Sequence, residues 1–450
     1  MGARTHRKRK LGPAMCVALV VGNMVGSGVF LLPASLAPLG WNSLYGWVAT
    51  LAGTLCLTVV LTRLARDLGG GSGPFTYPAA AFGPAAGFVI AWSYWITTWV
   101  TNAALALAVV ANLSVLWPGI GAAVVAPAIA VALIWLLVAV NCLGVRVAGD
   151  TQLVTTLLKL IPLLGAIGLA AWAISSGTVT VPAQDSVPIT LGAINAAATL
   201  TLFPMLGFES AMAAGERVED PRRTIPRATL IGTAIIGLVY ILASSAVTML
   251  LPAEDVAASN APFSYFFTAL IGPEVGALVA LFAAIAALGA LNGFTLLQGE
   301  LLLGPARSGM FPRWFAAENR FESPYRMHLL SSGLASLLVL VNYTRGLAKL
   351  FEFMVLVTTS TTIIFYVAGT VAAMKLERAQ RIGTSRGFLA VALAGLVYGF
   401  WAFYGAGLEA SLWSVAMTAV GVPIYFVMRA TVHSSPAAAD GPAAPPGSAA

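Results

Sequence analysis

Charged residues are scarce in this chain. Asp, Glu, Lys and Arg make up 9% of its 450 residues and hydrophobic residues make up 59%, whereas a soluble globular protein carries about 25% charged residues. This shortage excludes an ordinary soluble protein and predicts a polytopic membrane protein. The formal net charge of +7 does not indicate a nucleic-acid partner, because the basic residues gather in short loops between apolar runs, as membrane topology signals do.

Cysteine and histidine are also rare, with three residues of each. None shows metal-ligand spacing, so we expect no metal site and interpret the cysteines as small buried hydrophobes. The sequence has no Walker motif and no nucleophile–base set, which argues against an ATPase or another enzyme and predicts no cofactor. The six residues are Cys16, Cys56, Cys142, His6, His328 and His433.

Twelve apolar runs dominate the sequence, each long enough for the roughly 20 residues that a membrane-spanning helix needs. They predict an all-α polytopic membrane protein with twelve transmembrane helices. The loops between the runs are too short to hold a soluble domain. The runs cover residues 12–36, 42–65, 83–114, 121–144, 152–175, 190–214, 227–251, 272–304, 327–343, 350–374, 387–406 and 409–429.

The basic residues predict the orientation of these helices. With the N-terminus inside, all but three of the 24 basic residues lie in cytoplasmic segments; Arg345 and Lys349 lie in an outer loop and Lys159 lies inside a span. This bias predicts that both termini are cytoplasmic, with the protein in the inner or plasma membrane. Residues 1–11 form a basic cytoplasmic tail rather than a signal peptide, because the run after them is long and has no clear cleavage site. The Ser-, Pro- and Ala-rich residues 434–450 are expected to be a disordered cytoplasmic tail.

The first span contains a helix breaker, the stretch GNMVGSGVF at residues 22–30. Gly26, Ser27 and Gly28 are three consecutive small residues, which is more than a packing face spaced by four requires. The stretch predicts an unwound segment between two half-helices, whose freed N–H groups face an anionic group of a ligand. Close helix packing through small residues is the alternative.

The sixth span carries a matching interruption, TLTLFPMLGFES at residues 199–210. Pro204 lacks an N–H, Gly207 loosens the backbone after it, and Glu209 is an acid inside an apolar run. A kinked packing helix with Glu209 bonded to a neighbour is the alternative. Because spans 1 and 6 are each the first of five, the paired interruptions predict a five-plus-five inverted repeat with a binding site between the breaks. The predicted repeats cover 12–175 and 190–374, and two further helices cover 387–429.

Three other spans carry polar residues that need an explanation. Those of the third span recur at spacings of three and four, which predicts one polar helix face that lines a cavity or makes interhelix hydrogen bonds. Lys159 lies well inside the fifth span, where it acts as a fixed cation or a proton carrier unless it snorkels to the interface. Glu300 of the eighth span lines an inner vestibule or contacts another helix. The third-span residues are Tyr94, Thr97, Thr98, Thr101 and Asn102.

Taken together, these residues resemble those of the amino acid–polyamine–organocation transporters, and within them the bacterial arginine/agmatine antiporter group with its basic amino acid and polyamine relatives. The match runs over nearly all twelve spans. The stretches that carry it are GNMVGSGVFLLPASLA at 22–37, GGGSGPFTYPAAAFGP at 69–84, YWITTWVTN at 94–102, LGFESAMAAGERVEDPRRTIPRAT at 206–229, LNGFTLLQGE at 291–300 and SGMFPRWFA at 308–316.

The resemblance implies the five-plus-five fold of the LeuT type with discontinuous helices 1 and 6, two further helices, and usually a homodimer. It implies that a substrate α-carboxylate meets the N–H groups around Ser27 and Gly28. The α-ammonium would meet carbonyl groups near Met24, Phe203 and Leu206. The other matched positions are the substrate-stacking Phe203 and Phe294, the side-chain contacts Thr97, Thr98 and Asn102 with Asn23 nearby, Val25 and Gly26 of the unwound segment, the gating Tyr94, and the pH-linked acid Glu209.

Two departures from the arginine/agmatine pattern bear on the substrate. Phe203 and Phe294 stand where that antiporter has tryptophans, which weakens cation–π attraction and leaves room for neutral amino acids. Lys159 is absent from that pattern. It resembles the span-5 lysine of sodium-independent and proton-coupled relatives, in which an amine replaces a sodium ion.

The main hypothesis is therefore a sodium-independent secondary-active amino acid transporter that exchanges amino acids, basic amino acids and polyamines among them, by alternating access. The first alternative is a proton-coupled importer of neutral amino acids that uses Lys159. A non-transporting membrane sensor of amino acids is a second alternative. The sequence leaves the carried amino acid or amine open.

Overall fold

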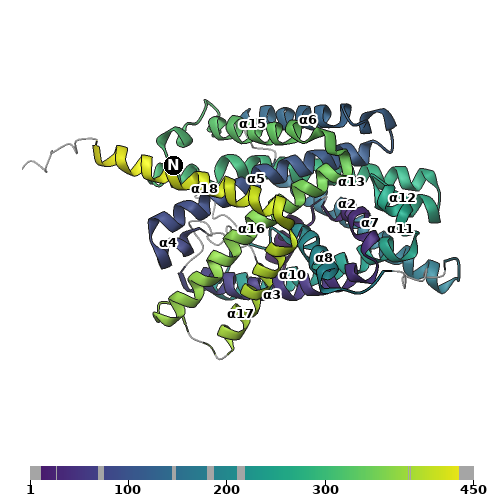
Figure 1. The fold of residues 1–450 in the computed structure, drawn as a ribbon, viewed down its shortest axis with the longest axis horizontal. Coiled ribbons are helices and arrows are strands. Elements are labelled where there is room, and N and C mark those ends of the chain that lie inside the picture. Colours follow the sequence, from purple (N-terminus) through teal and green to yellow (C-terminus); the bar gives the residue numbers. More distant parts are fainter. Residues whose placement is uncertain are drawn as a thin grey trace, which may run out of the picture.

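The computed structural model of the chain describes residues 12–26, 28–68, 75–143, 148–179, 187–209, 218–383, 385 and 387–434. All regular elements in these ranges are helices, and they pack along one another as a bundle (Figure 1). Some predictions lie outside the described residues. They concern Ser27, the tails 1–11 and 435–450, and the end of the sixth span at 210–214.

Nine helices among the described residues are long and apolar enough to span a membrane. A tenth span is possible if the bent pair α1 (Pro13–Met24) and α2 (Gly28–Leu36) is counted as one. The nine are α3 (Trp41–Leu68), α5 (Pro84–Leu113), α6 (Val125–Cys142), α7 (Ala148–Ser175), α10 (Pro221–Leu250), α13 (Pro273–Glu300), α16 (Leu347–Arg378), α17 (Phe388–Gly405) and α18 (Gly407–Ser434).

The two remaining predicted runs contain shorter apolar helices. They are α8 (Leu191–Met205) with 15 residues and α15 (Tyr325–Val341) with 17. Each of the twelve runs thus contains a helix, which makes the chain an all-helical polytopic membrane protein. Twelve complete spans and the inverted repeat remain predictions.

Large apolar side chains cover the outside of the bundle. Val397 and Phe400 of α17 are 67% and 60% exposed, and Phe426 of α18 is 62% exposed. A water-soluble protein does not expose so many large apolar side chains on adjoining helices. These faces are suited to contact with lipid.

Helix α5 is the most deeply buried of the nine spanning helices. It packs along α13 and α16, while α6 and α15 lie side by side at one edge of the bundle (Figure 1). Small residues such as Ala103, Ala104 and Ala108 are fully buried on α5 and let neighbouring backbones come close. The polar residues of α5 therefore face protein and not lipid.

Four short helices were not among the predicted elements; three lie between the spans, and α14 continues the candidate span that begins with α13. None has more than nine residues, so none produces an apolar run of spanning length. Helix α12 packs against α13 and against α2, close to the break in the first span. The four are α4 (Thr76–Phe82), α11 (Ala253–Ala258), α12 (Pro262–Leu270) and α14 (Leu303–Arg307).

Candidate functional site

The first span is broken at the predicted stretch. Helix α1 ends at Met24, α2 begins at Gly28, and the two are bent by 50° relative to each other. The Val25 N–H still donates to the Val21 carbonyl at 2.9 Å, and the Gly26 N–H donates to the Met24 carbonyl at 2.8 Å. The chain thus leaves the helix through a tight turn in which the Gly26 N–H already has a partner.

A tyrosine of another helix supports this break. Tyr240 of α10 is fully buried, and its hydroxyl donates to the Met24 carbonyl at 2.8 Å. A carbonyl freed by a helix break inside an apolar bundle is costly unless it is bonded. In this structure the Met24 oxygen is therefore held by protein groups rather than left open.

The helix of the sixth predicted span ends inside that span. Helix α8 ends at Met205, one residue after Pro204, and Leu206 is extended. Gly207 has a φ of +98°, and a Cβ there would lie 3.3 Å from the Asn23 carbonyl oxygen. Glycine is required for this backbone conformation, and the close approach places the end of α8 directly against the end of α1.

The two breaks touch at a second point, where Phe203 of α8 lies on Gly28. A Cβ on Gly28 would come within 2.5 Å of the Phe203 ring. The ring of Phe203 also meets Phe351 of α16 edge to face, with 6.3 Å between the ring centroids. The Phe203 ring therefore covers the start of α2, and Phe351 packs against that ring.

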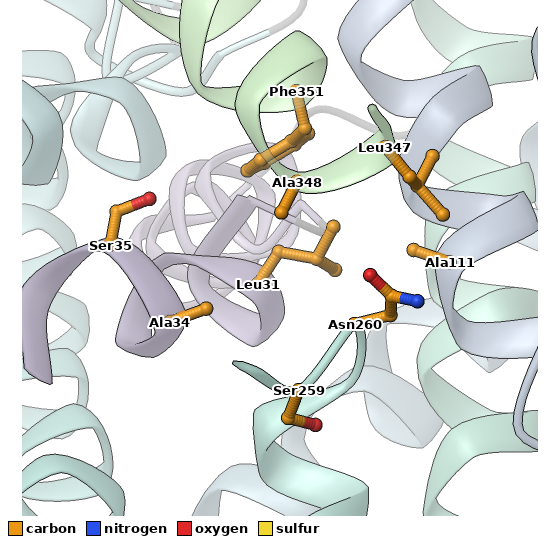
Figure 2. A pocket seen from close by; sticks show the side chains of 9 residues that line it. All are labelled: Leu31, Ala34, Ser35, Ala111, Ser259, Asn260, Leu347, Ala348 and Phe351. Carbon is orange, nitrogen blue, oxygen red and sulfur yellow. The ribbon is translucent and has the colours of Figure 1, made fainter. Parts of the chain in front are cut away.

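A narrow recess, too small for an amino acid, adjoins this aromatic pair, and Phe351 forms part of its lining. Figure 2 shows the side chains of Leu31 and Phe351 converging on it, with the Asn260 amide at its edge. The loop charges predict that this is the outer side of the bundle. The lining residues are Leu31, Ala34, Ser35, Ala111, Ser259, Asn260, Leu347, Ala348 and Phe351.

A second cluster closes the other side of the breaks. Glu209 is 7% exposed, and its two carboxylate oxygens accept hydrogen bonds from the hydroxyls of Tyr94 at 2.7 Å and Tyr366 at 3.1 Å. The rings of Phe208 and Phe365 pack against these tyrosines. The buried acid thus links the chain after α8 to α5 and α16.

The polar face predicted on α5 turns toward other helices. The hydroxyl of Thr362 on α16 donates to Thr97 Oγ1 at 3.3 Å, and Thr98 Oγ1 donates to the Trp95 carbonyl at 2.6 Å. Asn102 is fully buried and donates to the Gln298 side chain of α13 at 2.8 Å. Thr97 and Asn102 thus make interhelix hydrogen bonds, which is one of the two roles expected of this face. The other role, lining a cavity, stays a prediction.

The other predicted site residues are more dispersed. Phe294 is half-buried on α13, and no ring contact joins it to Phe203 within the described residues. Lys159 of α7 is 2% exposed, and no ion pair is formed with it in the part of the chain that the structure describes. Glu300 is exposed at the end of α13, so it does not belong to the buried site.

Sequence patterns did not identify the partners of these residues. Tyr240, Tyr366 and Gln298 each bond to a predicted site residue from a different helix. Gln298 offered a signal, because an amide inside an apolar span is costly without a partner. The two tyrosines offered none, since tyrosine is common in membrane helices.

A broken first span, whose break meets the end of α8 inside an apolar bundle, is typical of a membrane carrier with its site at that crossing. Comparison with known proteins agrees with this class. The family model described as amino acid permease matches residues 11–431. The chain therefore belongs to the amino acid permease family of the amino acid–polyamine–organocation transporters, so it is a multi-pass membrane transporter and not an enzyme.

Individual relatives include bacterial amine carriers. The putrescine transporter PotE of Escherichia coli K12 is 27% identical over 434 residues, covering 93% of this chain and 96% of the relative. The cadaverine/lysine antiporter of the same strain is 31% identical over 346 residues, covering 76% of this chain and 78% of the relative. PotE of Haemophilus influenzae is 27% identical over 423 residues, covering 93% and 97%.

Proposed function

We propose that this permease is a sodium-independent exchanger of amino acids or amines that works by alternating access. The observation that carries the proposal is the meeting of the two helix breaks, where Gly207 approaches Asn23 and Phe203 lies on Gly28. Freed backbone groups at such a crossing can bind both ends of an amino acid. The printed names of the relatives, a putrescine transporter and a cadaverine/lysine antiporter, support exchange of amine-bearing substrates.

The substrate is proposed to lie along the unwound segment, whose wall is formed by Asn23, Val25 and Gly26. Its α-carboxylate would accept from the N–H groups of Ser27 and Gly28 at the start of α2, where the helix dipole favours an anion. Its α-ammonium would donate to carbonyl groups at the end of α8, near Phe203 and Leu206. The Met24 carbonyl already accepts from Tyr240 in this structure, which favours the α8 side for the ammonium.

The rest of the pocket is proposed to come from α5 and α13. Thr97, Thr98 and Asn102 would contact the substrate side chain, and Phe294 would close over it. Phenylalanine attracts a cation less strongly than tryptophan does. Recognition of a charged substrate would therefore depend more on the polar side chains of α5 than on ring stacking.

Two gates would alternate during transport. Phe203 and Phe351 cover the breaks on the proposed outer side, and Glu209 with Tyr94 and Tyr366 covers them on the proposed cytoplasmic side. With both clusters in place, the arrangement supports an occluded conformation. Opening one cluster while the other stays closed would expose the site to one side at a time.

Charge at the outer end favours substrates with a second cationic group. Glu254 and Asp255 lie on the short helix α11, and Glu352 lies beside the recess, where it accepts a hydrogen bond from Ser35 at 2.9 Å. Carboxylates at the mouth of a cleft raise the local concentration of cations. These carboxylates would attract a basic amino acid or a diamine more strongly than a neutral amino acid.

Two further parts of the proposal concern the whole protein. Both termini are proposed to be cytoplasmic, in the inner or plasma membrane, because the loop charges follow the positive-inside rule. The carrier is proposed to be a homodimer, as the family resemblance implies.

A ligand screen on purified protein tests the proposed substrate class. Lysine, ornithine, putrescine or cadaverine should raise the unfolding midpoint in a thermal-shift assay, because a ligand at 100 times its Kd stabilises the native state by about 2.7 kcal/mol. Glutamate and glucose serve as controls and should leave the midpoint unchanged. If no amino acid or amine shifted it, the proposed binding site would be contradicted.

Lys159 is proposed to act as a fixed cation that replaces a coupling sodium ion. Lys159→Ala is expected to lower exchange by more than tenfold, because a buried ammonium is removed from α7, and the residual exchange should stay independent of sodium. The matched control is Lys349→Ala, at an exposed lysine of the proposed outer side, which should exchange at the wild-type rate. Wild-type exchange by Lys159→Ala would contradict this role.

The burial of Lys159 also favours the second candidate function, a proton-coupled importer of neutral amino acids. Under that hypothesis, an inward proton gradient drives alanine or leucine uptake into vesicles that contain no internal substrate, and Lys159→Ala abolishes it. Uptake that requires internal substrate would reject the importer and support the exchanger.

A further inference from the structure

A buried chain of amides and a hydroxyl crosses three helices behind the proposed site. Asn102 Nδ2 of α5 donates to Gln298 Oε1 of α13 at 2.8 Å, and Gln298 Nε2 donates to Ser332 Oγ of α15 at 2.9 Å. All three side chains are fully buried. Buried polar chains of this kind fix the rotamers of their members because each bond restricts the next.

The direction of this chain determines which atom of Asn102 remains free. A carboxamide has one oxygen that accepts and one nitrogen that donates. Gln298 donates through Nε2 to Ser332, so its Oε1 atom faces Asn102. Asn102 therefore donates to that oxygen through its own Nδ2 atom. Asn102 Oδ1 is thereby turned away from Gln298, and it is buried without a partner in the described part of the chain.

The two amides share helix faces with residues of the proposed site. Asn102 follows Thr98 by four residues on α5, and Gln298 follows Phe294 by four residues on α13, so each pair shares a helix face. Next to Phe294, the hydroxyl of Thr295 is also buried and unpartnered among the described residues. A buried acceptor is costly unless something donates to it, and a bound substrate is the group that can do so here.

Helix α15 supplies the far end of this arrangement although it contributes no proposed substrate contact. Its Ser331 accepts a hydrogen bond from the Trp95 indole N–H at 2.9 Å, and the next residue, Ser332, holds Gln298. Both bonds hold side chains of the α5 and α13 faces that border the site. This gives a physical reason for Ser331 and Ser332, two of the polar residues of α15.

We propose that Gln298, anchored by Ser332, is a positioning residue that turns the Asn102 carboxamide oxygen toward the substrate. The site then selects substrates whose far end carries an N–H donor, such as the terminal ammonium of lysine or putrescine. This inference rests on the proposed function and adds the residue pair that sets its substrate class. A site with the opposite amide orientation would instead favour a substrate with an acceptor or an apolar end.

Two ligand pairs that differ in one terminal ammonium test the inference, lysine against norleucine and putrescine against butylamine. Their Kd values are measured by isothermal titration on purified full-length protein. Wild type should prefer lysine and putrescine, and Gln298→Leu should lower this preference roughly 10- to 100-fold, the range for a hydrogen bond to a charged group. Norleucine and butylamine should bind the variant as they bind wild type.

A double-mutant cycle separates positioning from general damage to the fold. Asn102→Leu should lose the same preference, and Gln298→Leu added to it should cause no further loss, because Gln298 acts through Asn102. Gln298→Glu keeps an acceptor for Asn102 and should retain the preference. The matched control is Asn292→Ala on the same helix, which removes an interhelix amide pair with Asn141 at 2.9 Å and should leave the preference unchanged.

Three outcomes would overturn the inference. They are a wild type that prefers norleucine and butylamine, additive losses in the double mutant, and equal weakening of all four ligands by Gln298→Leu. If the wild type binds no amino acid or amine at all, the proposed function itself fails. That result differs from the other three, in which binding persists.

Discussion

Gly28→Val is expected to lower exchange roughly 100-fold. A Cβ at this position would lie 2.5 Å from Cδ1 and Cε1 of the Phe203 ring, well inside van der Waals contact, and valine adds two methyl groups beyond it. Overpacking of this kind costs about 1–3 kcal/mol, and each 1.4 kcal/mol corresponds to a factor of about ten. The ring must move from the position in which it covers the start of α2.

A second substitution shows whether the clash itself is responsible. Phe203→Ala should itself lower exchange, and Gly28→Val added to it should cause little further loss, because the ring that valine would meet is gone. Gly333→Val on α15 is the matched control, because a Cβ there meets no described atom within 4 Å, and it should exchange like wild type. Full activity of Gly28→Val, or an equally large further loss when Gly28→Val is added to Phe203→Ala, would contradict the proposed contact between Gly28 and Phe203.

Glu209→Gln is expected to lower the maximal exchange rate by about 10- to 100-fold. The carboxylate accepts from Tyr94 at 2.7 Å and from Tyr366 at 3.1 Å. The amide of glutamine is neutral and offers one acceptor oxygen, so one tyrosine can no longer donate and must accept from the NH₂ group, while the other donates to an uncharged oxygen. A hydrogen bond to a charged group contributes about 1.5–3 kcal/mol, which biases the inner gate toward the open state and slows the return to the occluded state.

Single tyrosine variants separate the contributions of Tyr94 and Tyr366 to the inner gate, the cluster that these two residues form with Glu209. Tyr94→Phe should reproduce much of the Glu209→Gln defect, and the double variant should be little worse than Glu209→Gln, because both remove one interaction. Tyr404→Phe, at an 83% exposed tyrosine of α17, is the matched control. An unchanged exchange rate in Glu209→Gln would show that the carboxylate does not hold the gate.

Composition and hydropathy were sufficient to predict the fold class. Apolar runs separated by basic loops predicted the helices, and each predicted run contains one. The predicted break of the first span was found between Met24 and Gly28, and α8 ends at Met205 inside the predicted sixth span. Glycine and proline determine these ends through local backbone geometry, which can be predicted from neighbouring residues alone.

The partners of the predicted site residues could not be predicted in the same way. Tyr240, Tyr366 and Ser332 reach their partners across helix interfaces, and such contacts depend on how whole helices rotate and pack. Periodicity identified the polar face of α5 but not which helix it meets. Twelve complete spans stay a prediction for a related reason, because α8 is shortened by the same break that marks the site.

Reconstituted exchange is the measurement that tests the central claim most directly. Wild-type protein in sodium-free liposomes loaded with unlabelled lysine or putrescine is given the labelled compound outside, and empty liposomes serve as the control. The account predicts rapid uptake into loaded liposomes, little uptake into empty ones, and no change when sodium is added. Failure to exchange any amino acid or amine, or a strict requirement for sodium, would contradict it.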